Sequence, residues 1–132
     1  MISKLIDRME LDHLLDYGCG GDHSLTDTLS PDRSFKYQAY DATVPEYASE
    51  PVPAELVVCI DSLSQIKPFQ VEGVLDSLEK LTEAVLFLVL DVDRMPIEWW
   101  LPRIMDRFSL QFVQVTDDNA IIIAYKSDYT IH

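Results

Sequence analysis

The sequence predicts an α/β fold with a mostly parallel sheet of about six strands. Apolar runs of about five to seven residues alternate with a segment whose apolar residues recur at helical spacing. The first apolar run ends in Asp16 and passes directly into a turn that contains Gly18, Gly20 and Gly21. A strand that ends in such a turn is typical of α/β domains that bind ligands.

The expected strands combine β-branched, aromatic and other apolar residues over short stretches. They cover His13–Tyr17, Phe35–Tyr40, Leu56–Ile60, Ala84–Leu90, Leu110–Thr116 and Ala120–Lys126. The last two flank Asp117-Asp118-Asn119, a turn composition that favours an antiparallel hairpin. The sheet should therefore be parallel at first and antiparallel at its C-terminal end.

Two helices are expected in the second half of the chain. Apolar residues of the first recur at i, i+3, i+4, i+7 and i+10, which gives one apolar face: Val71, Val74, Leu75, Leu78 and Leu81. The second covers Ile97 to Arg107 after Pro96, and Pro102 inside it predicts a kink or a later start. We expect one of Trp99 and Trp100 to lie in the core.

The glycine turn is the first candidate site. Glycine adopts positive φ at little cost and has no Cβ, so the backbone after the first strand can lie flush against a nucleoside-sized group. Asp16 places a negative charge beside this turn. Because isolated glycine turns are common, the turn needs support from other parts of the chain.

Two further strand ends provide that support. Asp41 follows the Phe35–Tyr40 strand about twenty residues after the glycines, where an acid can accept hydrogen bonds from both hydroxyls of a ribose. A third strand of the buried type ends in Asp61-Ser62-Leu63. In a parallel sheet these three strand ends lie at the same edge, where ligands bind.

In this order the three motifs resemble those of the class I S-adenosylmethionine-dependent methyltransferases, although Asp22 stands where a third glycine of the run could be expected. The resemblance implies a three-layer Rossmann-like fold and S-adenosylmethionine as cofactor. It places Gly18 to Gly20 at the methionine end of the ligand, Asp16 near its ammonium group, Asp41 on the ribose, and Ala42, Ser62 and Leu63 near the adenine. The full implied set is Asp16, Tyr17, Gly18, Cys19, Gly20, Asp41, Ala42, Ile60, Asp61, Ser62 and Leu63, with no metal ligand.

The chain departs from the family pattern between Asp41 and Leu56. This stretch is too short for a helix, a strand and a second helix, and Pro45, Pro51 and Pro53 interrupt it. One strand and its helix are therefore expected to be missing, which leaves Phe35–Tyr40 at the edge of the sheet. A bare edge strand invites pairing, so the chain should either self-associate there or fold residues 43–54 over the edge.

Other departures bear on catalysis. Only about twelve residues precede the first strand, and residues 91–96 lead directly into the second helix, so the site should be open and shallow. Relatives often carry an acid and a histidine where Ser64 and Gln65 stand, and no catalytic residue can be named. Methyl transfer does not strictly need a base, because the alignment of a nucleophile with the methyl group can supply much of the rate.

Length and charge limit the remaining possibilities. With 132 residues we expect a single minimal domain over 1–132. A net charge of −13 disfavours nucleic acid as a partner. The two cysteines lack metal-ligand spacing and no secretory segment opens the chain, which favours the cytoplasm. The apolar run Ala84–Leu90 is too short to span a bilayer.

Three functions remain open at this point. The first is methyl transfer from S-adenosylmethionine to an unidentified acceptor. The second is a non-catalytic module of the same ancestry that binds S-adenosylmethionine or a partner protein. The third is a nicotinamide dehydrogenase, which Asp16 disfavours because an acid before the turn suits an ammonium group better than a pyrophosphate.

Overall fold

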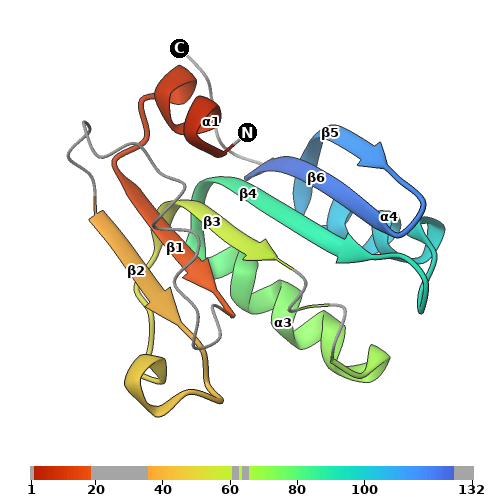
Figure 1. Ribbon diagram of the computed structural model, residues 1–132, viewed down its shortest axis with the longest axis horizontal. Coiled ribbons are helices and arrows are strands. Elements are labelled where there is room, and N and C mark those ends of the chain that lie inside the picture. Colours follow the sequence, from red (N-terminus) through yellow and green to blue (C-terminus); the bar gives the residue numbers. More distant parts are fainter. Residues whose placement is uncertain (1, 19–35, 61–62, 64–65, 127–132) are drawn as a thin grey trace.

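The computed structural model describes residues 2–18, 36–60, 63 and 66–126 (Figure 1). In chain order the elements are α1 (Ile2–Met9), β1 (His13–Tyr17), β2 (Lys36–Tyr40), the short 3-10 helix η1 (Pro45–Tyr47), β3 (Ala54–Ile60), α3 (Pro68–Leu81), β4 (Thr82–Asp91), α4 (Ile97–Met105), β5 (Phe108–Val115) and β6 (Asn119–Lys126). All six predicted strands are present, and the first has the predicted bounds.

The strands form one sheet in the order β2-β1-β3-β4-β6-β5. Neighbouring strands are parallel from β2 to β4, whereas β6 runs antiparallel to both β4 and β5. The hairpin between β5 and β6 is closed by the amide of Thr116, which donates to the carbonyl of Asn119 at 2.8 Å. The predicted α/β class and antiparallel C-terminal part are confirmed, and β2 lies at an edge as expected (Figure 1).

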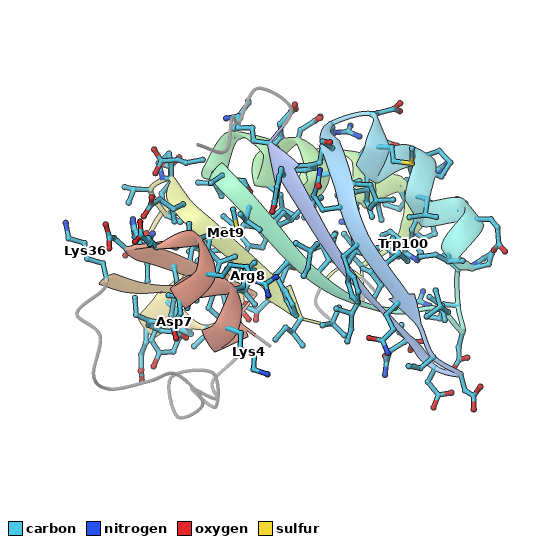
Figure 2. The ribbon with its side chains drawn as sticks, turned by 90° about the horizontal axis from the view of Figure 1, so that it is seen from above. Lys4, Asp7, Arg8, Met9, Lys36 and Trp100 are labelled. Carbon is cyan, nitrogen blue, oxygen red and sulfur yellow. The ribbon has the colours of Figure 1, made fainter. Side chains whose placement is uncertain are left out.

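Helices cover both faces of the sheet, which gives three layers (Figure 2). On one face α3 and α4 pack against Leu15, Val57 and Leu88, all fully or almost fully buried. On the other face α1 packs through Ile6 against a second cluster that includes Leu14. Because side chains alternate along a strand, β1 contributes to both clusters.

α1 was not among the predicted helices. Its apolar residues Leu5, Ile6 and Met9 recur at helical spacing over only eight residues, too short a window for a firm prediction. The helix ends at Met9; the next residue, Glu10, has a positive φ of 54°, and the amide of Leu11 donates to the carbonyl of Ile6 at 3.1 Å. Glycine or asparagine usually occupies such a position, so Glu10 did not signal the helix end.

The helix predicted around Ile97 begins there, so the later start that Pro102 suggested is wrong. Trp100 is 2% exposed and belongs to the core, as expected for one of the two tryptophans. Its indole nitrogen donates to the carbonyl of Met95 at 3.2 Å. Trp99 is half-buried, and the guanidinium of Arg103 lies 3.9 Å from its ring centre.

An ionic contact joins the end of α4 to α3. Arg107 donates to Glu72 at 2.6 Å and to Asp76 at 2.8 Å. Burial alone would lower the pKa of Arg107, but these two acceptors raise it above its ordinary value. Arg107 therefore remains charged, and the contact holds α3 and α4 side by side on one face.

The segment that replaces the missing strand lies along β2. The side-chain amide of Gln38 donates to the carbonyl of Val52 at 3.0 Å, and its oxygen accepts from the amide of Val52 at 2.9 Å. The amide of Asp41 also donates to the carbonyl of Tyr47 at 2.9 Å. These contacts correspond to the second expected alternative, in which residues 43–54 fold over the exposed edge.

Replacing Gln38 by alanine should loosen this segment. Each lost hydrogen bond contributes about 0.5–1.5 kcal/mol, so amide exchange at Val52 should become roughly threefold to tenfold faster. Hydrogen exchange followed by NMR measures this rate. Gln70→Ala is a matched control, because Gln70 also accepts from a backbone amide, that of Lys67, but lies on α3. Unchanged exchange at Val52 in Gln38→Ala would show that other contacts hold the segment.

Candidate functional site

Three strand ends meet at one edge of the sheet. β1 lies between β2 and β3, and all three are parallel, so Tyr17, Tyr40 and Ile60 end at the same side. The chain passes from β1 outward to β2 and then back across β1 to β3, which makes this edge a topological switch point. Ligands of open α/β sheets bind in the crevice at such a point.

A cavity of about 370 Å³ opens beside these strand ends. This volume lies in the range of small-molecule sites. Among the described residues of its wall, most side chains are apolar or aromatic and one is a carboxylate. The described residues that line it are Tyr17, Gly18, Tyr40, Asp41, Ala42, Thr43, Cys59, Leu63, Ile66 and Val74.

Gly18 joins the ends of two strands at the wall of this cavity. It has a φ of 76°, a backbone conformation that residues other than glycine rarely adopt. Its amide donates to the carbonyl of Tyr40 at 2.7 Å, which ties the turn after β1 to the end of β2. Glycine is thus required here by its backbone conformation, as the sequence predicted for this turn.

Asp41 is held in place by the loop that follows it. One carboxylate oxygen, Oδ1, accepts from the amide of Thr43 at 2.9 Å and from the hydroxyl of Thr43 at 2.6 Å. These two bonds fix the orientation of the carboxylate, and Asp41 lines the cavity.

Asp16 lies on the other side of β1 from Tyr17. It is 7% exposed, and its Oδ2 accepts from the hydroxyl of Tyr37 at 2.9 Å. Because side chains alternate along a strand, Tyr17 lies on the face covered by α3 and Asp16 lies on the face covered by α1. Asp16 is not among the described residues that line the cavity, and its place beside an ammonium group stays a prediction.

Tyr17 and Tyr40 form a pair of rings across β1 and β2. Their centres lie 5.1 Å apart, and both side chains line the cavity. Burial raises the pKa of the Tyr17 phenol, and Tyr40 and Cys59 raise it further. The Tyr17 hydroxyl therefore stays protonated at neutral pH, where it can donate a hydrogen bond but cannot act as a base.

Solved structures of several methyltransferases resemble this molecule. Magnesium protoporphyrin IX methyltransferase from Synechocystis PCC 6803, solved with bound S-adenosylmethionine, has a TM-score of 0.74 at 18% identity over 96% of this chain and 76% of that chain. The N-methyltransferase NodS from Bradyrhizobium japonicum WM9, solved with S-adenosylhomocysteine, has a TM-score of 0.66 at 12% identity over 96% and 86%. The fold is that of the class I methyltransferases.

This methyltransferase fold does not by itself determine the activity. The cyclase SpnF is equally similar, with a TM-score of 0.70 at 13% identity over 95% of this chain and 79% of its own. No family model and no curated protein sequence matches the chain. Function must therefore be argued from the site rather than from the fold.

Among the described residues, no helix is both long and apolar enough to cross a membrane. Nor do His, Cys, Asp and Glu side chains in that part of the chain gather in a group of three that could hold a metal ion.

Five of the eleven residues predicted for the site line the cavity: Tyr17, Gly18, Asp41, Ala42 and Leu63. Four others, Cys19, Gly20, Asp61 and Ser62, lie outside the described residues, as do Ser64 and Gln65. Ile60 is 40% exposed at the end of β3 and does not belong to the described lining.

Sequence reasoning missed five residues of the lining: Tyr40, Thr43, Cys59, Ile66 and Val74. Two of them had a usable signal, because Tyr40 directly precedes Asp41 and Thr43 is placed two residues after an acid, where its side chain can bond back. The others come from β3, α3 and the loop between them. Whether these three side chains reach the cavity depends on how α3 packs on the sheet.

A second cavity of about 320 Å³ shares Tyr17 and Tyr40 with the first cavity. Its described lining is Tyr17, Tyr40, Glu50, Pro51, Ser77, Lys80 and Leu81. It thus opens between α3 and the segment that replaces the missing strand. The side chains of both tyrosines therefore border both cavities.

Proposed function

We propose that this chain binds S-adenosylmethionine in the 370 Å³ cavity and transfers its methyl group to an acceptor that is not yet identified. One observation carries the proposal. Gly18, with its positive φ, and Asp41, with its oriented carboxylate, follow adjacent parallel strands and line one cavity. This combination suits a ligand that has a polar chain at one end and a ribose at the other.

The lining suits each part of the ligand. Asp41 would accept hydrogen bonds from the two ribose hydroxyls, and the Gly18 turn would lie against the methionine end. Ala42 and Leu63, with the apolar Ile66 and Val74, would enclose the adenine. Cys19, Gly20, Ile60, Asp61 and Ser62 remain proposed members of the site from the sequence, together with Asp16.

The residues of the chain would position the reactants rather than activate them. When bound, the cofactor would supply an activated methyl group on its sulfonium, with S-adenosylhomocysteine as the leaving group. Tyr17 would donate a hydrogen bond, because its phenol is protonated, and its ring would exclude water. The acceptor's proton would pass to solvent, so orientation supplies most of the rate.

A non-catalytic module is the second candidate. Ser64 and Gln65 stand where relatives often have an acid and a histidine. The similarity to a cyclase shows that this fold also serves other chemistry, so the fold alone does not imply methyl transfer. Such a module would bind S-adenosylmethionine or a partner protein without methylating anything.

Calorimetric titration separates the candidates. S-adenosylmethionine, S-adenosylhomocysteine and the reduced nicotinamide cofactors would be titrated in turn into the protein. Binding of the two adenosyl ligands alone is the expected result. Binding of a nicotinamide cofactor alone would replace the proposal with a dehydrogenase, and binding of none would leave the partner-binding alternative.

Turnover of free small acceptors should be slow even where the cofactor binds well. The described cavity wall has groups for the adenosyl ligand, whereas no second wall for an acceptor was evident from the sequence. A radiolabelled methyl-transfer screen should find rates far below about 10 per second, the median for enzymes. Rapid methylation of a small acceptor would show that other segments close over the cofactor.

The cellular compartment and the class of acceptor are proposed from the cysteine chemistry and the net charge of the chain. We propose a reducing cytoplasm, since Cys59 is a buried thiol. A net charge of −13 opposes binding to a phosphate backbone, so the acceptor should not be nucleic acid.

A further inference from the structure

Asp16 is a buried acid at the edge of the sheet where the strands end. Its exposed fraction is 7%, and no other charged side chain among the described residues is buried. A carboxylate that loses its water is unfavourable unless polar groups surround it, and an apolar residue would pack there at lower cost. This burial therefore points to a role of Asp16 in binding rather than in packing.

The hydroxyl of Tyr37 on β2 donates to Oδ2 of Asp16 on β1 at 2.9 Å. In the parallel register Tyr37 pairs with Leu14, two residues before Asp16, so both side chains lie on the same face. The residue opposite Asp16 itself is Ala39. Its small side chain leaves space for the Tyr37 ring to reach along the face toward the carboxylate.

Packing holds the Tyr37 ring in this position. The side chain is half-buried and lies against the cluster that joins α1 to the sheet. A ring that the core already holds loses little further freedom when its hydroxyl forms a hydrogen bond. The Tyr37 hydroxyl therefore fixes the direction of the Asp16 carboxylate.

Asp16 and the cavity lie on opposite faces of the sheet, with the glycine turn between them. Gly18 follows Asp16 by two residues and lines the cavity, whereas the intervening Tyr17 packs on the α3 face. An adenosyl group in the cavity would reach Asp16 only through a chain that crosses this turn, where Gly18 has no side chain in the way. In S-adenosylmethionine that chain is the amino acid, which ends in an ammonium group and a carboxylate.

We propose that Tyr37 is a positioning residue for the amino-acid end of the ligand, because its hydroxyl orients the Asp16 carboxylate toward the ammonium group. The inference rests on the proposed binding of S-adenosylmethionine. An ammonium group donates hydrogen bonds, so a carboxylate that is already oriented binds it with less loss of freedom. A hydroxyl also suits this task because it orients the carboxylate without cancelling the negative charge, as a lysine or arginine would.

Two ligands separate this role from packing. S-adenosylhomocysteine and methylthioadenosine share the adenosyl group and a thioether, but only the first carries the amino acid. In calorimetry, Tyr37→Phe should weaken binding of S-adenosylhomocysteine about fivefold to tenfold and leave binding of methylthioadenosine within about twofold. A structural role alone would lower the melting temperature without changing the ratio of the two affinities, and that result would overturn the proposal.

Tyr125→Phe is the matched control. Tyr125 is also half-buried against the cluster on the α1 face, but it lies on β6, which β3 and β4 separate from β1. Loss of its hydroxyl should change neither affinity. Asp41→Ala, by contrast, should weaken both ligands, since both contain the ribose.

Asp16→Asn completes a double-mutant cycle. Asparagine keeps the shape of the side chain but not its charge, so this variant should weaken S-adenosylhomocysteine more than Tyr37→Phe does. Adding Tyr37→Phe to Asp16→Asn should then cause almost no further loss, because the hydroxyl acts through the carboxylate. Additive losses would contradict this route and overturn the proposal.

The wild type distinguishes failure of this inference from failure of the proposed function. If it binds neither ligand, the proposed function is wrong and the role of Tyr37 falls with it. If it binds both ligands equally well, the adenosyl site stands, but the ammonium group has no contact for Tyr37 to position. Tighter binding of S-adenosylhomocysteine than of methylthioadenosine is the expected result.

Discussion

Replacing Gly18 by valine is expected to abolish binding of S-adenosylmethionine. At a φ of 76° a side chain is strained, and a β-branched one more so than alanine. The added atoms would also project at a turn that lines the cavity. Calorimetry should show affinity reduced by more than about a hundredfold, and the free energy of unfolding should fall by about 1–2 kcal/mol.

Gly73→Ala is the control for this variant. Gly73 lies in α3, is exposed, and a Cβ there would meet nothing within 4 Å. Alanine should therefore raise the free energy of unfolding by about 0.5–1 kcal/mol, since glycine is unfavourable inside a helix. Ligand binding should not change. Wild-type affinity in Gly18→Val would mean that the turn has no contact with the ligand.

Asp41→Ala is expected to weaken S-adenosylmethionine binding between about tenfold and a hundredfold. Hydrogen bonds from hydroxyls to a charged acceptor contribute on the order of 1.5–3 kcal/mol each, and the ribose has two such hydroxyls. The variant also removes the acceptor of both bonds from Thr43, which loosens the loop. Both effects lower the affinity measured by calorimetry.

Asp91→Ala separates ligand contact from loop geometry. Asp91 likewise ends a strand, and its Oδ1 accepts from the amide of Asp93 at 2.8 Å. It does not belong to the described lining of the 370 Å³ cavity. The two variants should lose similar stability in thermal melts, but only Asp41→Ala should lose affinity. If the two variants bind S-adenosylmethionine equally well, Asp41 does not contact the ribose.

The strands and the position of Asp41 were predictable because their signals are local. A run of apolar residues marks a strand wherever it packs, so His13–Tyr17 could be predicted with its observed bounds. Pairing between parallel strands then brings the residues after Tyr17 and Tyr40 to one edge. The antiparallel hairpin was readable for the same reason, from the turn residues between β5 and β6.

Other features depend on contacts between distant segments. α1 is too short for its helical periodicity to be recognised in the sequence. It is stabilised by the packing of Ile6 on the sheet. The place of Asp16 near the ammonium group of the ligand stays a prediction, and the alternation of β1 brings its carboxylate to the Tyr37 hydroxyl. A strand-end acid can face either side, and only the register with β2 and the helices on each face decide between them.

By itself, the sequence determined the α/β class, the absence of one strand, and the glycine turn and Asp41 as candidate ligand contacts. Each of these follows from backbone preferences or side-chain periods that span a few residues. The tertiary structure decided that Gln38 ties residues 43–54 to β2, and that Cys59, Ile66 and Val74 belong to the cavity wall. Those outcomes depend on which surfaces meet when the sheet and its helices pack, and short-range preferences carry no information about such encounters.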